Sequence, residues 1–353
     1  MVQQDVLNVG LIGVGVISDQ AHIPAWRSLS GARIAALAEL REQRAKAMAE
    51  KWGIRDWYTD YRRILEREDI HIVDLALPHH LHCQIACEAM EAGKHVLVEK
   101  PMARNLEEID RMIQTARQAG VKLMVSEFWR YSPIHRKALT AIQQGYLGEV
   151  FMIRSEHCNR ATGVAKPLPP DEAAWKLDLE KMGGGVLLGV SCHPLSMAMM
   201  FCGQVDSIAA MAAYRARPEW FPENFELTVM SLIKFSNGIV GEITSSVQTT
   251  GYFHYQTWIF GSRGNIVMDM VTGDFKLVSE VLGPAAAEYG KPLLDRDQEE
   301  PAGYVATMQH LVDCINQDRE PETSGEVERE TVRTLLAGYK SMQEGRIVKV
   351  SEI

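Results

Sequence analysis

The chain has 353 residues, of which 46% are apolar and 24% charged, a globular composition that excludes disordered, collagen-like and coiled-coil chains. Domains usually have roughly 100–200 residues, so the length predicts two of them. With 37 basic against 46 acidic residues the formal net charge is −9, so the protein would repel a phosphate backbone and nucleic acid is not expected as a partner.

Cysteine usage and hydropathy indicate the cellular compartment in which the protein works. The six cysteines form no Cys-x-x-Cys pair and are too few for a disulfide scaffold, which indicates a reducing environment. The segment from Met1 to Gly13 carries no basic flank before its apolar run, so we expect no signal peptide. No stretch reaches the roughly 18 consecutive apolar residues of a membrane span. These features predict a soluble, cytoplasmic protein without a membrane partner.

The first part of the chain alternates short apolar runs with longer amphipathic segments. This pattern predicts βαβ units, and therefore an α/β domain with a doubly wound parallel sheet. A helix over 81–92 is expected to end at Gly93, and Asn105 with Glu108 predicts the capped start of another helix. We expect strands at 6–12, 32–38, 70–77, 94–98 and 121–125.

The pattern changes after Glu127, where prolines and glycines interrupt the alternation and the later strands suggest antiparallel pairing. We expect one domain over 1–127 and a second over 128–353. The second is expected to be α+β, with a large, open, mainly antiparallel sheet.

Turn and cap signals divide this second region. The Asn237-Gly238 step between two β-rich runs predicts a hairpin, and the segment Gly261–Gly264 predicts another turn. Near the end, Thr323 is expected to cap a long helix that stops at Gly345.

The segment Gly13–Ser18 follows the first predicted strand and opens a helix, as a dinucleotide-binding fingerprint does. Gly13 would allow the tight turn, and Gly15 would let the backbone approach a pyrophosphate at the helix start. Ser18 stands where the third glycine of the pattern is common. A plain strand–helix turn is the alternative for so short a pattern.

Glu39 favours the fingerprint interpretation. It ends the second predicted strand 21 residues after Ser18, close to the spacing of about 20 expected for the acid that binds the adenosine ribose. An acid at this position repels a 2′-phosphate, so NAD is favoured over NADP, although Arg41 would offset part of the repulsion.

Glu99-Lys100-Pro101, at the end of a parallel strand, resembles a motif of the Gfo/Idh/MocA oxidoreductases. Other segments extend the resemblance almost end to end: Pro78 with His82, Gly93–Val96, Gly148–Val150, Gly183–Gly185 with His193, and Tyr339–Ser341. The resemblance implies an N-terminal Rossmann domain and a substrate-binding and oligomerisation domain. It also implies a set of cofactor-binding residues: Gly13, Gly15, Val16, Ile17, Glu39, Leu40, Pro78, His82, Glu99, Lys100 and Trp175.

Lys100 and His193 are the candidate catalytic residues. Lys100 leaves the carboxyl end of a parallel strand, where doubly wound sheets bind ligands, so its ammonium would stabilise a developing alkoxide. From position alone a solvated lysine is the alternative. The resemblance places the acid/base histidine at His193, which the sequence otherwise suggests is a core residue.

The family usually has an aspartate four residues before this histidine, whereas this chain has Gly189. A carboxylate there would orient the imidazole and raise its basicity. The residues nearby in sequence that could fill the gap are Asp178, Glu156 and His157.

The run His79–His82 contains three histidines, but no further ligand follows at a metal-binding spacing, so no metal is expected.

These features lead to three functional hypotheses. The first is an NAD-dependent dehydrogenase or reductase that transfers a hydride between NAD and a secondary hydroxyl or carbonyl of a sugar, polyol or related cyclic alcohol. The second, suggested by Gly189, is a nucleotide-binding sensor or co-regulator without turnover. The third is an enzyme that uses NAD to assist glycoside cleavage. The resemblance also implies a homodimer or homotetramer formed through the open sheet.

Overall fold

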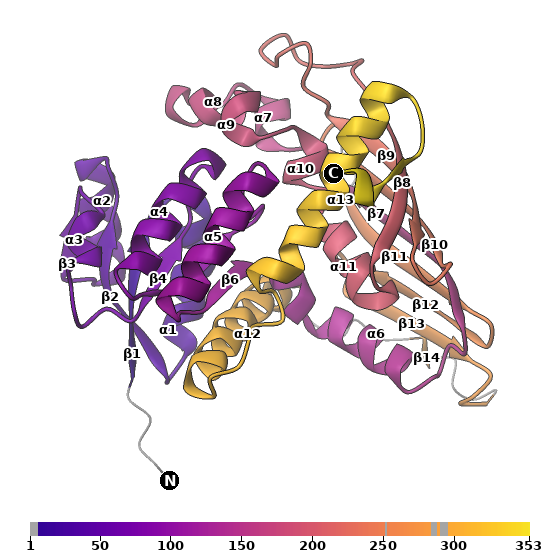
Figure 1. The fold of residues 1–353 in the computed structure, drawn as a ribbon, viewed down its shortest axis with the longest axis horizontal. Coiled ribbons are helices and arrows are strands. Elements are labelled where there is room, and N and C mark those ends of the chain that lie inside the picture. Colours follow the sequence, from indigo (N-terminus) through magenta and orange to yellow (C-terminus); the bar gives the residue numbers. More distant parts are fainter. Residues whose placement is uncertain (1–5, 251–252, 284–287, 290–295) are drawn as a thin grey trace. The chain divides into compact units, whose positions relative to one another are not determined.

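The computed structural model describes residues 6–250, 253–283, 288–289 and 296–353 and divides the chain into two compact units (Figure 1). The first unit comprises residues 1–131 and 300–329, and the second comprises 132–299 and 330–353. The boundary predicted from the sequence, at residue 127, assigns residues 300–329 to the second domain. In the structure these residues belong to the first unit. Residues 1–5, on which the signal-peptide expectation partly rests, lie outside the described residues.

The first unit contains sheet A, whose six strands are ordered β3-β2-β1-β4-β5-β6 and pair in parallel throughout. This confirms the predicted doubly wound parallel sheet. The short strand β3 was not predicted, because its three half-buried residues carry no apolar run. The strands are β1 (Leu7–Ile12), β2 (Ala32–Ala38), β3 (Asp56–Tyr58), β4 (Ile72–Leu75), β5 (His95–Glu99) and β6 (Leu123–Ser126).

The helices of this unit follow the βαβ pattern, and α4 and α5 pack beside each other on the sheet (Figure 1). The Asn105 side chain accepts the Glu108 backbone N–H at 2.9 Å, which confirms the predicted cap of α5. The helices are η1 (Ser18–His22), α1 (Ile23–Ser28), α2 (Glu42–Trp52), α3 (Arg62–Leu65), α4 (His79–Glu91), α5 (Leu106–Ala119), η2 (Phe128–Tyr131) and most of α12 (Arg296–Asn316).

The second unit contains the nine-stranded sheet B, ordered β14-β13-β12-β11-β7-β10-β9-β8-β15. Only the β7–β10 pair is parallel among the described strands of this sheet. The predicted α+β domain with a mainly antiparallel sheet is confirmed. The strands are β7 (Val150–Cys158), β8 (Val205–Ala213), β9 (Thr228–Phe235), β10 (Val240–Ser246), β11 (His254–Gly261), β12 (Gly264–Asp269), β13 (Asp274–Ser279), β14 (Glu288–Tyr289) and β15 (Val348–Lys349).

The turn signals correspond to real connections in sheet B. β9 and β10 form an antiparallel hairpin around Asn237-Gly238, and β11 joins β12 through the turn 262–263. On β9, Val229 and Ile233 are buried whereas Met230 and Leu232 are exposed. One face of the sheet therefore contacts helices, and the other presents exposed apolar side chains.

Helices α10 and α11 pack on β7, β9 and β10 of this sheet. The helices of the second unit are α6 (Pro133–Gln143), α7 (Thr162–Ala165), α8 (Pro170–Lys176), α9 (Leu179–Met182), α10 (Val186–Gly189), α11 (Cys192–Cys202), most of α13 (Gly325–Glu344) and η3 (Val350–Glu352).

The predicted cap of α13 is wrong by one residue. The Thr323 hydroxyl donates to the carbonyl oxygen of Val125 at 2.7 Å, whereas Ser324 Oγ accepts the Val327 N–H at 3.5 Å. The Val125 carbonyl that accepts the threonine hydroxyl is 198 residues away in the chain, so the local sequence does not predict this contact. The predicted stop is confirmed, since Gly345 follows the helix with a left-handed φ of 64°.

Of the helices in the described ranges, none is by itself long and apolar enough to cross a bilayer. The segments 179–189 and 192–202 meet the length and composition criterion only as a pair bent by 47°.

Candidate active site

The turn after β1 is built around glycine. Gly13 has a left-handed φ of 86°, and a Cβ there would overlap the Ala76 carbonyl oxygen and lie 2.8 Å from Leu77 Cδ2. At Gly15 a Cβ would meet nothing within 4 Å, so the backbone borders open space. Ser18 Oγ donates to the Gly13 carbonyl at 2.7 Å and closes the turn. Ser18 thus has a hydrogen-bonding role that a third glycine would lack.

Glu39 faces this turn from the end of β2. It is buried, and its Oε2 accepts the Val14 N–H at 3.5 Å. Its Oε1 accepts Arg41 Nε at 2.9 Å, so Arg41 already offsets part of the Glu39 charge. The side chain expected to favour NAD therefore lies beside the fingerprint, as its spacing predicted.

Large apolar side chains are exposed next to these polar groups. Val16 and Ile17 on the turn are 59% and 37% exposed, and Leu40 after Glu39 is 86% exposed. An open glycine backbone, a carboxylate acceptor and adjacent apolar surface fit a dinucleotide, whose pyrophosphate, ribose and adenine need such groups. These residues can therefore hold NAD.

Lys100 follows β5 directly and is half-buried, and its peptide bond to Pro101 is cis. The Glu99 carboxylate accepts the Lys100 backbone N–H at 3.2 Å through Oε2 and contacts His22 Nε2 at 2.9 Å through Oε1. Burial would raise the pKa of Glu99, but the hydrogen bond and charge of His22, together with the charge of Lys100, lower it. Glu99 is therefore a carboxylate beside Lys100.

Glu127 is a second acidic residue near Lys100, and in the sequence it marks only the predicted domain boundary. It is buried just after β6, and burial raises its pKa to about 8, although the charge of Lys100 partly opposes the shift. At pH 7 the Glu127 carboxyl is therefore mostly protonated. Its chemistry follows from burial, which the sequence does not show.

Pro78 and His82 lie at the start of α4, where Pro78 is the N-terminal cap residue. The His82 ring is fully buried and contacts the carbonyl oxygens of Leu77 at 2.9 Å and Pro101 at 3.1 Å. Burial lowers the pKa of His82, although its contacts with the backbone carbonyl oxygens oppose the shift. These contacts support the loop after Lys100, and direct contact of His82 with the cofactor stays a prediction.

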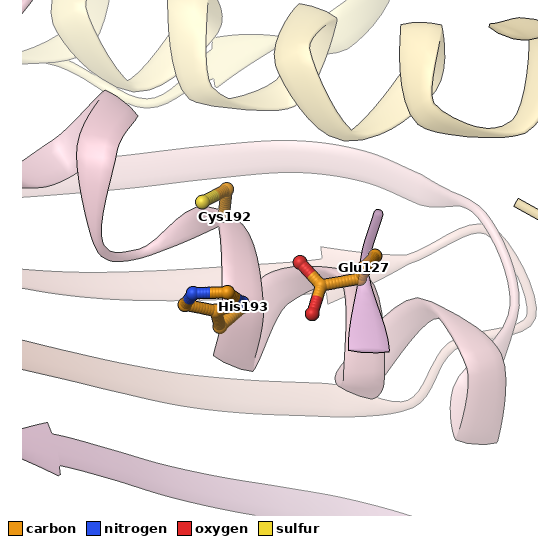
Figure 2. A group of neighbouring side chains, drawn as sticks. All are labelled: Glu127, Cys192 and His193. Carbon is orange, nitrogen blue, oxygen red and sulfur yellow. The ribbon is translucent and has the colours of Figure 1, made fainter. Parts of the chain in front are cut away.

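In the second unit, His193 lies at the start of α11 beside Cys192, and Figure 2 shows both side chains on that helix. His193 is buried, and its ring stacks on that of His157 from β7, with centroids 5.8 Å apart. The His157 ring lies 3.9 Å from that of Tyr255 on β11. A histidine pair thus stands on the helix-covered face of sheet B.

The absence of an aspartate at Gly189 does not result from crowding. A Cβ at Gly189 would meet only Met182 Cε, at an ordinary contact distance of 3.5 Å. Two of the nearby acids have other roles: Asp178 caps α9, and Glu156 pairs with His254 at 2.7 Å. Of the candidates considered, His157 is the residue whose contact with His193 is established.

A buried clamp fixes the glycine loop that leads into α10. Glu226 Oε1 accepts the Tyr339 hydroxyl at 2.5 Å and the Gly185 N–H at 3.1 Å. A Cβ at Gly184 would overlap Tyr339, and one at Gly185 would overlap Glu226. Burial raises the pKa of Glu226, while the hydrogen bond from Tyr339 opposes the shift. The Tyr339 and Glu226 side chains therefore fix the conformation of the motif residues Gly183–Gly185.

Lys100 belongs to the first unit, whereas His193 and Trp175 belong to the second. Their assignment to one site, and the contact of Trp175 with the cofactor, remain predictions.

Comparison with known proteins defines the class first. A model described as an oxidoreductase family with an NAD-binding Rossmann fold matches residues 7–127. A model of the GFO/IDH/MocA C-terminal domain matches residues 135–267. The protein is an NAD-dependent oxidoreductase. The two matches cover more than half of the chain, which belongs to the GFO/IDH/MocA family, and the resemblance read from the sequence is confirmed.

The similar proteins include dehydrogenases named for a polyol and for an anhydrosugar. The chain is 26% identical over 351 residues to myo-inositol 2-dehydrogenase of Thermotoga maritima, covering 98% of this chain and 99% of that protein. It is 29% identical to levoglucosan dehydrogenase of Pseudarthrobacter phenanthrenivorans, over 74% of this chain and 73% of that protein. A solved levoglucosan dehydrogenase in complex with NADH and levoglucosan is 25% identical, with a TM-score of 0.87, covering 98% of this chain and 100% of that one. The predicted dehydrogenase or reductase acting on CH–OH groups is confirmed.

Proposed function

We propose that the protein transfers a hydride between NAD and a secondary hydroxyl or carbonyl of a sugar, polyol or related cyclic alcohol. The observation that carries the proposal is Lys100 at the carboxyl end of β5, on the sheet whose β1 carries the open glycine turn. Ligands of doubly wound sheets bind at this end of the strands. The names of the relatives support a sugar or polyol as the substrate class.

Bound NAD supplies the hydride acceptor or donor, and the protein must hold the substrate and move a proton. The Lys100 ammonium would donate a hydrogen bond to the substrate oxygen and stabilise alkoxide character in the transition state. His193 would take the hydroxyl proton during oxidation and return it during reduction. The stacked His157 ring would hold the His193 imidazole in place for this proton transfer.

The test is NADH formation from a panel of cyclic alcohols that includes myo-inositol and levoglucosan, with wild type, Lys100→Met and Lys349→Met. Lys349 is an exposed lysine on β15 and serves as a matched control. We expect Lys100→Met to abolish turnover while NAD binding stays within a few-fold of wild type, and the control to keep full activity. An active Lys100→Met variant would remove Lys100 from the mechanism.

The sensor and the glycoside-cleaving enzyme remain outcomes of the same panel. Saturable NAD binding without turnover on any alcohol would support a sensor. Cleavage of a glycoside without net NADH formation would support the other alternative. The relatives carry dehydrogenase and reductase names and favour neither of them.

We also propose that the protein forms a homodimer or homotetramer through the exposed face of sheet B, and that it works in the cytoplasm, in keeping with its free cysteines. Five apolar residues on strands of this sheet are 48–74% exposed: Met211, Met230, Leu232, Val240 and Val278. Contiguous exposed apolar surface commonly marks an interface. Light scattering should show that Leu232→Asp lowers the oligomeric state, whereas Val281→Asp, at an exposed apolar residue beyond β13, does not. A monomeric wild type would contradict the proposal.

A further inference from the structure

A buried set of charged side chains joins the helix after the fingerprint to the end of β5. His22, the last residue of η1, contacts Asp74 on β4 through Nδ1 at 2.8 Å and Glu99 on β5 through Nε2 at 2.9 Å. The Trp26 indole N–H donates to the same Asp74 carboxylate at 2.7 Å. The side chains of His22 and Asp74 are fully buried, and that of Glu99 is 10% exposed.

The hydrogen bonds define the charge of His22. An ionised carboxylate only accepts hydrogen bonds, so two ring nitrogens that each face a carboxylate must each carry a proton. A neutral imidazole has a single N–H and would leave one contact without a donor. Burial alone would lower the pKa of His22, but the charge and hydrogen bond of Asp74, followed by those of Glu99, raise it to about 10. His22 is an imidazolium at neutral pH.

We propose that His22 is a positioning residue that keeps Glu99 ionised and oriented beside Lys100, and so acts on the active site without touching the substrate. The inference rests on the proposed function, because it gives Lys100 the role of holding the substrate oxygen. One Glu99 oxygen contacts His22 and the other accepts the Lys100 backbone N–H. Rotation of this carboxylate would release both contacts.

Glu127 shows what Glu99 would become without His22. Both acids are buried, and the charge of Lys100 lowers the pKa of each. The pKa of Glu127 nevertheless rises to about 8, whereas that of Glu99 is lowered, and the hydrogen bond and charge of His22 are the largest contributions that lower it. Loss of the imidazolium should therefore leave Glu99 protonated at pH 7.

The ionisation of Glu99 affects the protonation of Lys100. A neighbouring carboxylate favours the ammonium form of a lysine, and an ammonium donates the hydrogen bonds that an alkoxide requires. Besides Asp74, three charged or titratable groups lie around this network: Lys100 after β5, Glu127 after β6 and Arg130 on η2. The Tyr304 ring on α12 packs 5.2 Å from the His22 ring.

The experiment compares His22→Gln, Glu99→Gln, the double variant and a control, His95→Gln. His95 begins β5, accepts the Lys122 N–H at 3.0 Å, and is neutral because burial lowers its pKa to about 4. It is thus a histidine on the strand of Glu99 whose ring contacts a backbone N–H instead of a buried carboxylate. Infrared spectra at pH 7 count protonated buried carboxyl groups, and peptide mass spectrometry after brief acetic anhydride treatment reports the free-amine fraction of Lys100.

We expect His22→Gln to gain a protonated-carboxyl band that disappears in the double variant. Acetylation of Lys100 at pH 7 should rise severalfold in both single variants and no further in the double variant, while His95→Gln matches wild type in both measurements. If substrate is turned over, kcat should fall in His22→Gln with KM little changed. A His22→Gln protein without the new band, or with acetylation of Lys100 at the wild-type rate, would overturn the proposal.

A further measurement needs no variant at His22. Nitrogen NMR of ¹⁵N-histidine-labelled wild type at pH 8.5 should show one ring with both nitrogens protonated, and Glu99→Gln should perturb that ring. A neutral His22 at this pH would overturn the proposal even if His22→Gln failed to fold. These signals do not depend on turnover, so failure on every alcohol would count against the proposed function alone.

Discussion

Replacing Gly13 or Gly15 by alanine should separate folding from cofactor binding within one turn. An alanine at Gly13 must adopt a left-handed φ of 86° and displace the Ala76 carbonyl. The conformation costs about 1–2 kcal/mol and the overpacking about 1–3 kcal/mol, so the free energy of unfolding should fall by about 2–5 kcal/mol. Since each kcal/mol lowers Tm by roughly 2–4 °C in a unit of this size, we expect a decrease of roughly 5–15 °C.

Gly15→Ala should do the opposite. Its Cβ meets nothing within 4 Å, so stability should change by about 0.5 kcal/mol or less. The methyl group would occupy the space that the pyrophosphate needs, and one lost hydrogen bond to a charged group, about 1.5–3 kcal/mol, weakens NADH binding by roughly 10–150-fold.

Thermal unfolding followed by circular dichroism and NADH titration calorimetry measure both quantities on each variant. A Gly13→Ala protein with the Tm of wild type would refute the steric argument. Wild-type NADH affinity in Gly15→Ala would show that the cofactor does not approach this backbone.

Three further predictions concern charge. Glu39→Ala should shift cofactor preference toward NADP, because it removes the carboxylate that repels a 2′-phosphate. Calorimetry with both cofactors measures this preference. A wild type that binds NADP more tightly than NAD would contradict the assignment of Glu39. Gly189→Asp should move the acid limb of the kcat/KM profile to higher pH, because a carboxylate one turn before His193 favours its imidazolium form. A fully active His193→Ala variant would exclude His193 as the base. The pKa of His22 is raised from 6.5 to about 10, so its contribution to stability is complete below pH 6.5 and is lost as the pH rises through 10. Urea unfolding of wild type between pH 6 and pH 10.5 should show this decline, and His22→Gln should show less of it.

The features that the sequence predicts well are local. The apolar run of β1, the turn at Gly13 and the Asn237-Gly238 hairpin each depend on residues adjacent along the chain, where backbone preference and side-chain alternation determine the structure. Glu39 was also predictable, because the length of one βα unit fixes its distance from the fingerprint.

The features that escaped the sequence are those made by distant residues. His22 meets Asp74 and Glu99 across 52 and 77 positions, and no periodic pattern links the three. The protonation of Glu127 arises from burial by elements that the local sequence does not specify. His157 reaches His193 because β7 lies under α11, a packing relation that follows from the fold alone.

The return of residues 300–329 to the first unit has a consequence for biosynthesis. The Phe128 ring stacks on Tyr304 at 4.2 Å, and the Val125 N–H donates to the Thr323 carbonyl at 2.8 Å, so the last strand of sheet A is completed by late residues. Strands β7 to β14 of sheet B are synthesised before those residues emerge from the ribosome, and only β15 follows them. The nucleotide-binding half, although encoded first, is therefore completed only after most of sheet B has been synthesised, and a nascent chain stalled before residue 300 would display an unfinished edge of sheet A.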